Sequence, residues 1–115
     1  MKKLTIKRSE WYRGQGGVNS SLLKNNGEKC CLGFYLLNVR KATKEQILNI
    51  KCPSFCNIFC PELVDEETII IGNKVDNVIG SKLMSVNDSQ MISEEERELE
   101  LKELFKKIEI DVKFV

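Results

Sequence analysis

One segment of the chain has no polar face, and this constrains the fold more than any other feature. Residues 30–39 read CCLGFYLLNV and are followed directly by Arg40 and Lys41. An element that is apolar nearly all round belongs in a protein interior, and its length and cationic end favour a helix. A chain of 115 residues fits one hydrophobic core. We therefore predict a single domain, residues 1–115, in which this helix is buried.

Other helices are predicted by their end signals. Thr43 and Ser93 each open a capping box, with Gln46 and Glu96 three residues later. The second box starts a helix whose apolar residues recur at i, i+3, i+4 and i+7, namely Leu101, Leu104, Phe105 and Ile108. The apolar positions of residues 78–86 predict a further helix, which closes near the Asn-Asp pair that follows it.

The two ends of the chain alternate apolar and polar residues, which is typical of strands with one buried face. This period-2 pattern covers residues 3–8 and 110–115. Two single-faced strands need partners and a covering layer, so we expect them to pair with each other. The predicted fold class is α+β, with a small antiparallel sheet that includes the N- and C-terminal strands and is covered by three to four helices.

The net charge of +1 conceals an uneven distribution. Residues 1–51 carry eleven Lys or Arg and three acids, a net of +8, whereas residues 52–115 carry seven bases and fourteen acids, a net of −7. The two halves either neutralise each other in the fold or form separate basic and acidic faces. Since many of the acids belong to the helix after Ser93, we expect partial neutralisation that leaves a basic patch on the first half.

The residue types argue against catalysis. The chain has no histidine, which removes the commonest general base and the commonest transition-metal ligand. The five cysteines are an odd number in a chain without an export signal, so reduced thiols are expected. Cys52, Cys56 and Cys60 could hold zinc with Cys30 or Cys31, but their spacing differs from that of zinc modules, and buried thiols are the simpler interpretation. We expect no enzyme, no metal and no cofactor.

The chain is expected to be cytoplasmic. Its longest apolar runs fall far short of the roughly 20 residues that a membrane-spanning helix needs. The first residues lack an apolar segment of signal-peptide length. Direct nucleic-acid binding is disfavoured by the low net charge and by the absence of an interleaved basic and aromatic repeat.

A glycine-rich loop in the basic half carries the candidate site. Residues 14–17 read GQGG, without the Gly-Lys-Ser/Thr ending of a P-loop. Nearby stand Arg8 and Arg13, whose planar forks suit phosphate or carboxylate, and Trp11, which offers a stacking face. The following stretch adds two hydroxyls, Ser20 and Ser21. These are ingredients of a nucleotide or anion site. Alternatively, Trp11 fills the core while the two arginines pair with the acidic second half.

Several motifs resemble those of a family of small bacteriophage and prophage proteins. They are an Arg-Gly loop at residues 13–14, the Cys-Cys-Leu-Gly-Phe segment at residues 30–34, and an Asn-Asp dipeptide at residues 87–88 before an acidic helix. The resemblance spans nearly the whole chain except residues 51–77. It implies a phage origin, and seven residues match polar or special positions of the family: Arg8, Trp11, Arg13, Gly14, Ser21, Asn87 and Asp88.

Together these observations predict a phage-type accessory protein with a counter-defence role. It would bind and sequester a small anionic, nucleotide-derived ligand at the seven residues, without catalysis, in the cytoplasm of the host cell. Because small phage proteins without catalytic motifs often inhibit host systems, the alternative is a protein-interaction inhibitor of a host enzyme or defence complex. Homo-oligomerisation is open, and an enzyme would have to rely on Asp88 or on a reactive cysteine.

Overall fold

The apolar segment forms the central helix of the protein. The computed structural model describes residues 1–17, 20–50 and 77–115. Helix α1 spans Cys31–Asn38, and its first six residues are all buried. The predicted buried helix is therefore confirmed, and only its last turn reaches the surface.

The two terminal strands pair with each other, but in parallel. Strand β1 spans Lys2–Ile6 and β2 spans Ile110–Phe114, with Leu4 opposite Val112. The predicted antiparallel sheet is wrong. A period-2 pattern is the same for a parallel and an antiparallel strand. Here the direction of β2 is set by the helix before it, because the chain turns back from that helix through the tight turn 107–109. The rest of the chain provides the long crossover that a parallel pair requires.

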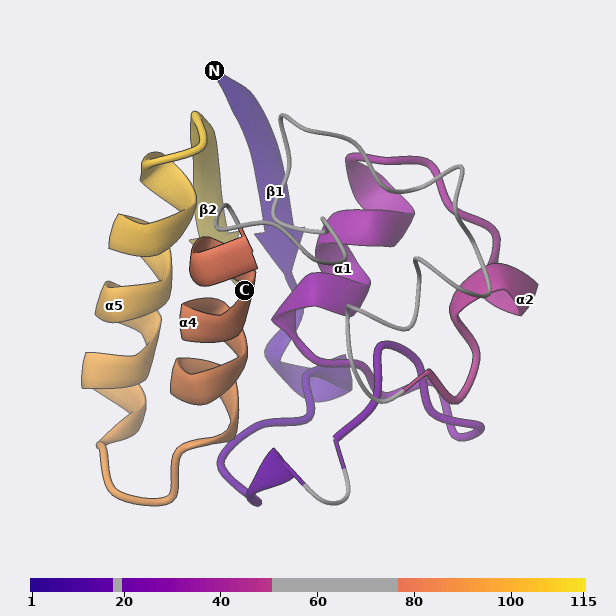
Figure 1. The fold of residues 1–115 in the computed structure, drawn as a ribbon, viewed down its shortest axis with the longest axis horizontal. Helices are drawn as coiled ribbons and strands as arrows, with labels where there is room; N and C mark the ends of the chain where they lie inside the picture. The colour runs from indigo at the N-terminus through magenta and orange to yellow at the C-terminus, as the bar shows by residue number, and fades with distance from the viewer. Residues whose placement is uncertain (18–19, 51–76) are drawn as a thin grey trace.

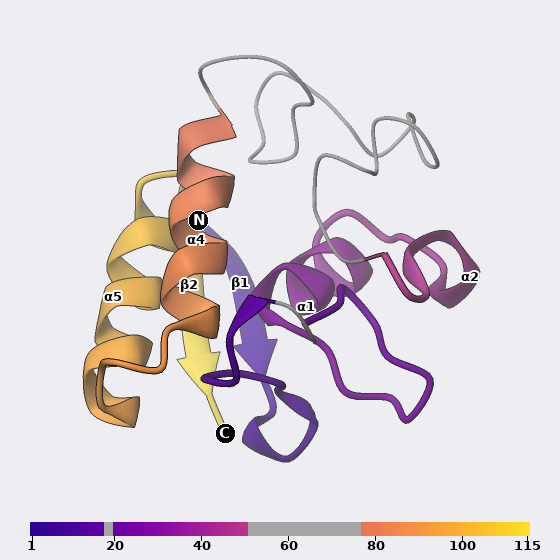
Figure 2. The same cartoon turned by 60° about the horizontal axis from the view of Figure 1, so that its bottom comes forward.

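Helices cover one face of this sheet. Helix α1 packs against β1, helix α5 (Glu94–Lys106) packs against β2, and helix α4 (Asn77–Asp88) lies between α1 and α5 (Figure 1). The short helix α2 (Lys44–Ile47) lies beyond α1, on the side away from α5, in both views (Figures 1 and 2). Helices α1 and α5 contact the sheet most closely, and the described residues form four α-helices, which agrees with the three to four that we predicted.

The helix starts follow the predicted end signals. The Thr43 side chain accepts a hydrogen bond from the Gln46 backbone and the Gln46 side chain accepts one from the Thr43 backbone, which completes the capping box of α2. The Ser93 hydroxyl caps α5 by accepting from the Glu96 N–H at 3.2 Å. These caps depend on residues three apart, so the sequence alone locates them.

The first strand, predicted for residues 3–8, ends two residues earlier than expected. Strand β1 ends at Ile6, and the next residues form a single 3-10 turn, η1 (Arg8–Glu10). The Arg8 N–H donates to the carbonyl of Val115, so the loop begins beside the end of β2. Trp11 therefore packs beside the end of β2, where the centroids of its ring and the Phe114 ring are 5.0 Å apart.

One prediction falls outside the described residues, namely the zinc alternative at Cys52, Cys56 and Cys60. None of the helices that the structure describes has the length and hydropathy of a membrane span.

Candidate functional site

Five of the seven predicted site residues meet where the first loop crosses the end of α4. They are Trp11, Arg13, Gly14, Asn87 and Asp88. Asn87 is completely buried at the centre of this junction. Its Oδ1 accepts from Trp11 Nε1 at 2.7 Å and from the Cys31 backbone N–H at 3.0 Å. Its Nδ2 donates to the Tyr12 carbonyl at 3.1 Å and to Asp88 Oδ1 at 2.9 Å. Asn87 therefore joins the loop, α1 and α4, and its amide has no hydrogen-bonding capacity left for a ligand.

The glycines of the loop serve this junction as well. Gly14 and Gly16 have φ values of +72° and +77°, which other residues adopt only with strain. Their N–H groups donate to the carbonyls of Asn87 and Asp88, each at 2.9 Å. The loop thus satisfies the end of α4, and these two donors are not free to bind a phosphate.

The two arginines of the candidate site are paired with the acidic helix α5. Arg8 makes a two-pronged contact with Glu98, at 2.8 Å from Nε and 2.7 Å from Nη2. Arg13 Nε donates to Glu94 at 2.9 Å, and its guanidinium lies 4.5 Å from the centre of the Trp11 ring. Trp11 itself is only 2% exposed. The alternative interpretation, in which Trp11 fills the core and the arginines pair with the acidic half, is therefore confirmed.

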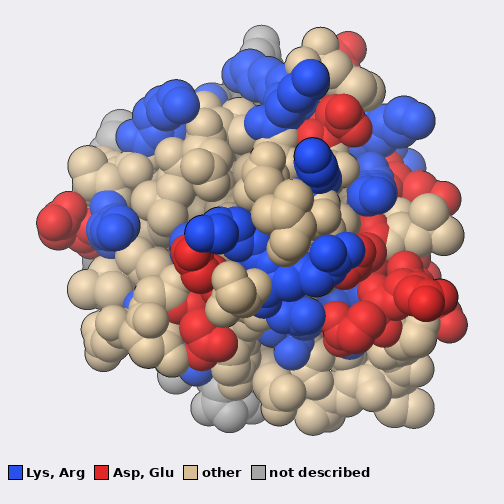
Figure 3. Space-filling view, turned by 180° about the vertical axis from the view of Figure 1, so that it is seen from behind, with Lys and Arg blue, Asp and Glu red and all other residues tan. Residues whose placement is uncertain are grey.

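A space-filling view agrees with this pairing. Seen from behind the sheet, Lys and Arg groups gather in the middle of the face and Asp and Glu groups border them (Figure 3). Groups of opposite charge therefore lie next to one another on this face (Figure 3).

Arg97 belongs to the same junction, and the sequence analysis missed it. Its side chain is 2% exposed and donates from Nη1 to the carbonyls of Val86 and Asn87, at 2.7 and 3.1 Å. A Cβ on Gly14 would approach its Nη2 to 3.0 Å, so the glycine leaves room for this guanidinium. One signal was present: the apolar stripe of α5, continued four residues back from Leu101, reaches Arg97.

Asp88 and Ser21 complete the predicted set. Burial raises the pKa of the Asp88 carboxyl, against the opposing effects of the Asn87 hydrogen bond, the neighbouring Ser20 hydroxyl and the positive charge of Arg97. Ser21 is 5% exposed, and its carbonyl accepts from the Cys30 N–H at 3.1 Å. Both residues are thus part of the packing around the junction.

The hollow beside the junction is poorly suited to an anion. It measures about 430 Å³ and contains two of the predicted residues, Trp11 and Arg13. Its other charged lining residues are Glu28 and Glu94, and Glu94 already pairs with Arg13. Two carboxylates against one arginine repel a negatively charged ligand.

A second hollow has the opposite charge. It measures about 790 Å³ and lies where the start of β1, the end of α1 and the turn before β2 meet. Among the described residues that line it, three are cationic, Lys2, Arg40 and Lys107, and one is acidic, Glu109. No sequence pattern marks this group, because its members are far apart in the chain. The only signal was the strong positive charge of the first half.

The described cysteines have no reactive features. Cys30 and Cys31 are buried free thiols. Burial raises the pKa of Cys30 to about 12 and the pKa of Cys31 well above its ordinary value. A nucleophilic cysteine needs a lowered pKa and access to substrate. Within the described residues, no group of three His, Cys, Asp or Glu side chains could hold a metal ion.

The chain matches no protein-family model, no curated protein and no solved structure. The resemblance to small phage proteins therefore stays a prediction from the motifs.

The arginine pairs predict how stability depends on pH. The hydrogen bond from Arg8 lowers the pKa of Glu98. For Glu94, burial acts upward, but Arg13 and Arg97 outweigh it and the pKa is lowered. A carboxylate whose pKa is lowered by folding stabilises the fold above its unfolded value of about 4.5, and loses this contribution as the pH falls through the folded pKa. We expect the urea midpoint to fall as the pH drops below about 4.5.

A variant that lacks one ion pair tests this assignment. Arg8→Gln should reduce the acid sensitivity of the urea midpoint, because Glu98 then has a pKa close to its unfolded value. Lys106→Gln changes an exposed residue of the same helix as Glu98 and serves as the control. It should show the same pH dependence of the urea midpoint as the wild type. Equal acid sensitivity in Arg8→Gln and the wild type would contradict the assignment.

Proposed function

We propose that the protein binds a small anionic ligand of the nucleotide type without catalysis, and that the ligand lies in the hollow lined by Lys2, Arg40 and Lys107. The supporting observation is that three cationic side chains from separate parts of the chain converge on one hollow. This hollow replaces the loop 8–17 as the proposed ligand site, since the hollow beside that loop is lined by two carboxylates and one arginine.

The size and the walls of the hollow support a ligand larger than a simple ion. Its volume of about 790 Å³ lies within the range of roughly 300–1,000 Å³ that is common for small-molecule sites. Val39 and Ile108, both partly buried, supply apolar surface beside the charged groups. A nucleotide combines the two groups that such a hollow can bind. Its phosphate would contact the cations, and its flat base would lie against the apolar surface.

Backbone strain at the hollow also supports a functional role. Glu109 lines the hollow with φ +61°, and Lys41, next to Arg40, has φ +59°. Both residues follow the end of a helix, where glycine is usual. A left-handed backbone costs a non-glycine residue about 1–2 kcal/mol, and such strain tends to concentrate at functional sites.

The biological setting is a proposal that follows from the motifs. A phage-type accessory protein that sequesters a nucleotide-derived signal in the host cytoplasm needs an anion site and no catalytic group. Buried thiols of raised pKa and the absence of histidine agree with such a role.

The test is a thermal-shift and calorimetric screen with inorganic phosphate, nucleoside mono-, di- and triphosphates, and cyclic dinucleotides. A ligand that binds only the folded state raises the melting temperature by mass action. Arg40→Gln and Lys107→Gln should each weaken binding by about tenfold or more, because a charged hydrogen bond contributes about 1.5–3 kcal/mol. Lys106→Gln is the matched control and should bind normally.

Glu109→Asn gives the opposite expectation. It removes an acid from the described lining residues and keeps a side chain that tolerates a left-handed backbone. Binding should therefore strengthen. The proposal is overturned if no probe shifts the melting temperature, or if a shift is lost in Arg13→Ala and retained in Arg40→Gln.

A further inference from the structure

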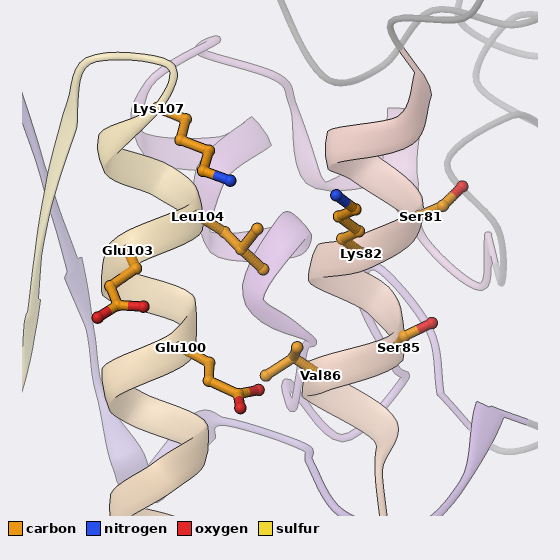
Figure 4. Close-up of a pocket in the computed structure, with 8 residues that line it drawn as sticks. All are labelled: Ser81, Lys82, Ser85, Val86, Glu100, Glu103, Leu104 and Lys107. Carbon is orange, nitrogen blue, oxygen red and sulfur yellow. The ribbon is translucent and has the colours of Figure 1, made fainter.

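A groove of about 580 Å³ runs between α4 and α5. Its floor is apolar, because Val86 and Leu104 point into it from the two helices (Figure 4). Both side chains are partly buried, so the two helices leave part of their shared apolar surface uncovered. This groove is separate from the basic hollow except for Lys107, which lines both.

The charges of the groove are divided between its two ends. At one end, Lys82 from α4 and Lys107 from α5 extend toward each other across the opening (Figure 4). At the other end, Glu100 reaches across toward Val86, whereas Glu103, the fourth charged lining residue, points to the side of α5 away from α4 (Figure 4). All four charged side chains are exposed, and none of them forms an ion pair within the described part of the chain.

We propose that this groove is the interface of a homodimer related by a two-fold axis through its centre. Such an axis exchanges the two ends, so the basic end of one copy faces the acidic end of the other. Each Glu100 carboxylate would then lie between Lys82 and Lys107 of the second copy. In a patch with charges of one sign, the same axis would place like charges opposite one another.

The helices suit this arrangement. The chain passes from α4 to α5 through the short connection 89–93, and the two helices run side by side as an antiparallel pair (Figures 1 and 2). Two such pairs, packed face to face, form a four-helix arrangement around the apolar residues of both grooves. Val86 and Leu104 of each copy would be covered by the same residues of the other, as a self-complementary interface requires.

The experiment measures molar mass by sedimentation and by light scattering after size-exclusion chromatography, over a series of protein concentrations. The wild type should be a dimer at the highest concentrations. Lys82→Glu and Glu100→Lys should each be monomeric, because each places like charges opposite one another. These two residues line the groove and not the basic hollow, so ligand binding should be unchanged in both variants.

An equimolar mixture of the two variants provides the decisive measurement. In a two-fold dimer, the new carboxylate at position 82 of one chain faces the new ammonium group at position 100 of the other, and the native pair is retained on the opposite side. The mixture should therefore form a heterodimer although neither variant forms a dimer alone. Lys106→Glu and Glu95→Lys, two exposed changes of α5 away from the groove, should stay dimeric.

Circular dichroism of each variant checks that it is folded. A wild type that is monomeric at every concentration overturns the proposal, even if the groove binds a peptide of another protein. A dimer that both charge reversals leave intact also overturns it, since that dimer would use another surface. Restoration of dimer in the mixture supports it.

Discussion

Gly33→Ala is expected to destabilise the protein more than alanine at Gly14, Gly16, Gly17 or Gly27. A Cβ at residue 33 would lie 1.8 Å from the carbonyl oxygen of Leu22 and 2.8 Å from Lys29 Cβ. The first of these atoms belongs to the backbone, so the clash cannot be relieved by a rotamer change. Helix α1 would have to move away from the chain segment beneath it. Since overpacking a core commonly costs about 1–3 kcal/mol, we expect a loss of at least about 3 kcal/mol.

The matched control is Gly27→Ala. Gly27 has φ +91°, and a Cβ at this position would have no atom within 4 Å, so alanine there meets strain but no clash. Its cost should be about 1–2 kcal/mol. Urea denaturation of both variants compares the two effects. If Gly33→Ala is as stable as Gly27→Ala, the close crossing of α1 over Leu22 is wrong.

Removal of the Asn87 side chain should have the next largest effect. Asn87→Ala leaves the Trp11 indole N–H, the Cys31 N–H and the Tyr12 carbonyl without their partner. Each buried polar group left without a hydrogen bond costs about 1–3 kcal/mol. We therefore expect a loss of at least about 3 kcal/mol in the free energy of unfolding, with the loop 11–14 released from α4.

Asn38→Ala is the control for this variant. Its amide donates to the Phe34 carbonyl within α1, from an exposed position at the end of the helix. Loss of that bond should cost less than about 1 kcal/mol, since water replaces the amide. A double-mutant cycle of Asn87→Ala with Trp11→Phe measures the indole bond directly. Additive effects in that cycle would show that the bond contributes nothing.

The candidate site shows what a residue pattern leaves open. Arg8, Trp11, Arg13 and the glycines have the same composition whether they hold a phosphate or join two parts of the fold. The ion pairs with Glu94 and Glu98 separate these alternatives, and the pairs connect residues more than eighty positions apart. No local pattern contains that information.

The basic hollow was missed for the same reason. Lys2, Arg40 and Lys107 come from three distant segments and share no spacing that a motif could describe. Arg97 is a partial exception, because its place on the apolar stripe of α5 is a local property. A charged residue on a buried helical face indicates a specific polar partner, and here the partners are the carbonyls of Val86 and Asn87.

The sequence by itself determined the features that depend on neighbours along the chain. The burial of α1 follows from its lack of a polar face. The starts of α2 and α5 follow from capping residues that lie three positions apart. The terminal strands follow from the alternation of apolar and polar residues. The tertiary structure decided the direction of the sheet and the partners of the charged side chains. Alternation is identical in parallel and antiparallel strands, and an arginine binds any carboxylate that the fold brings within reach.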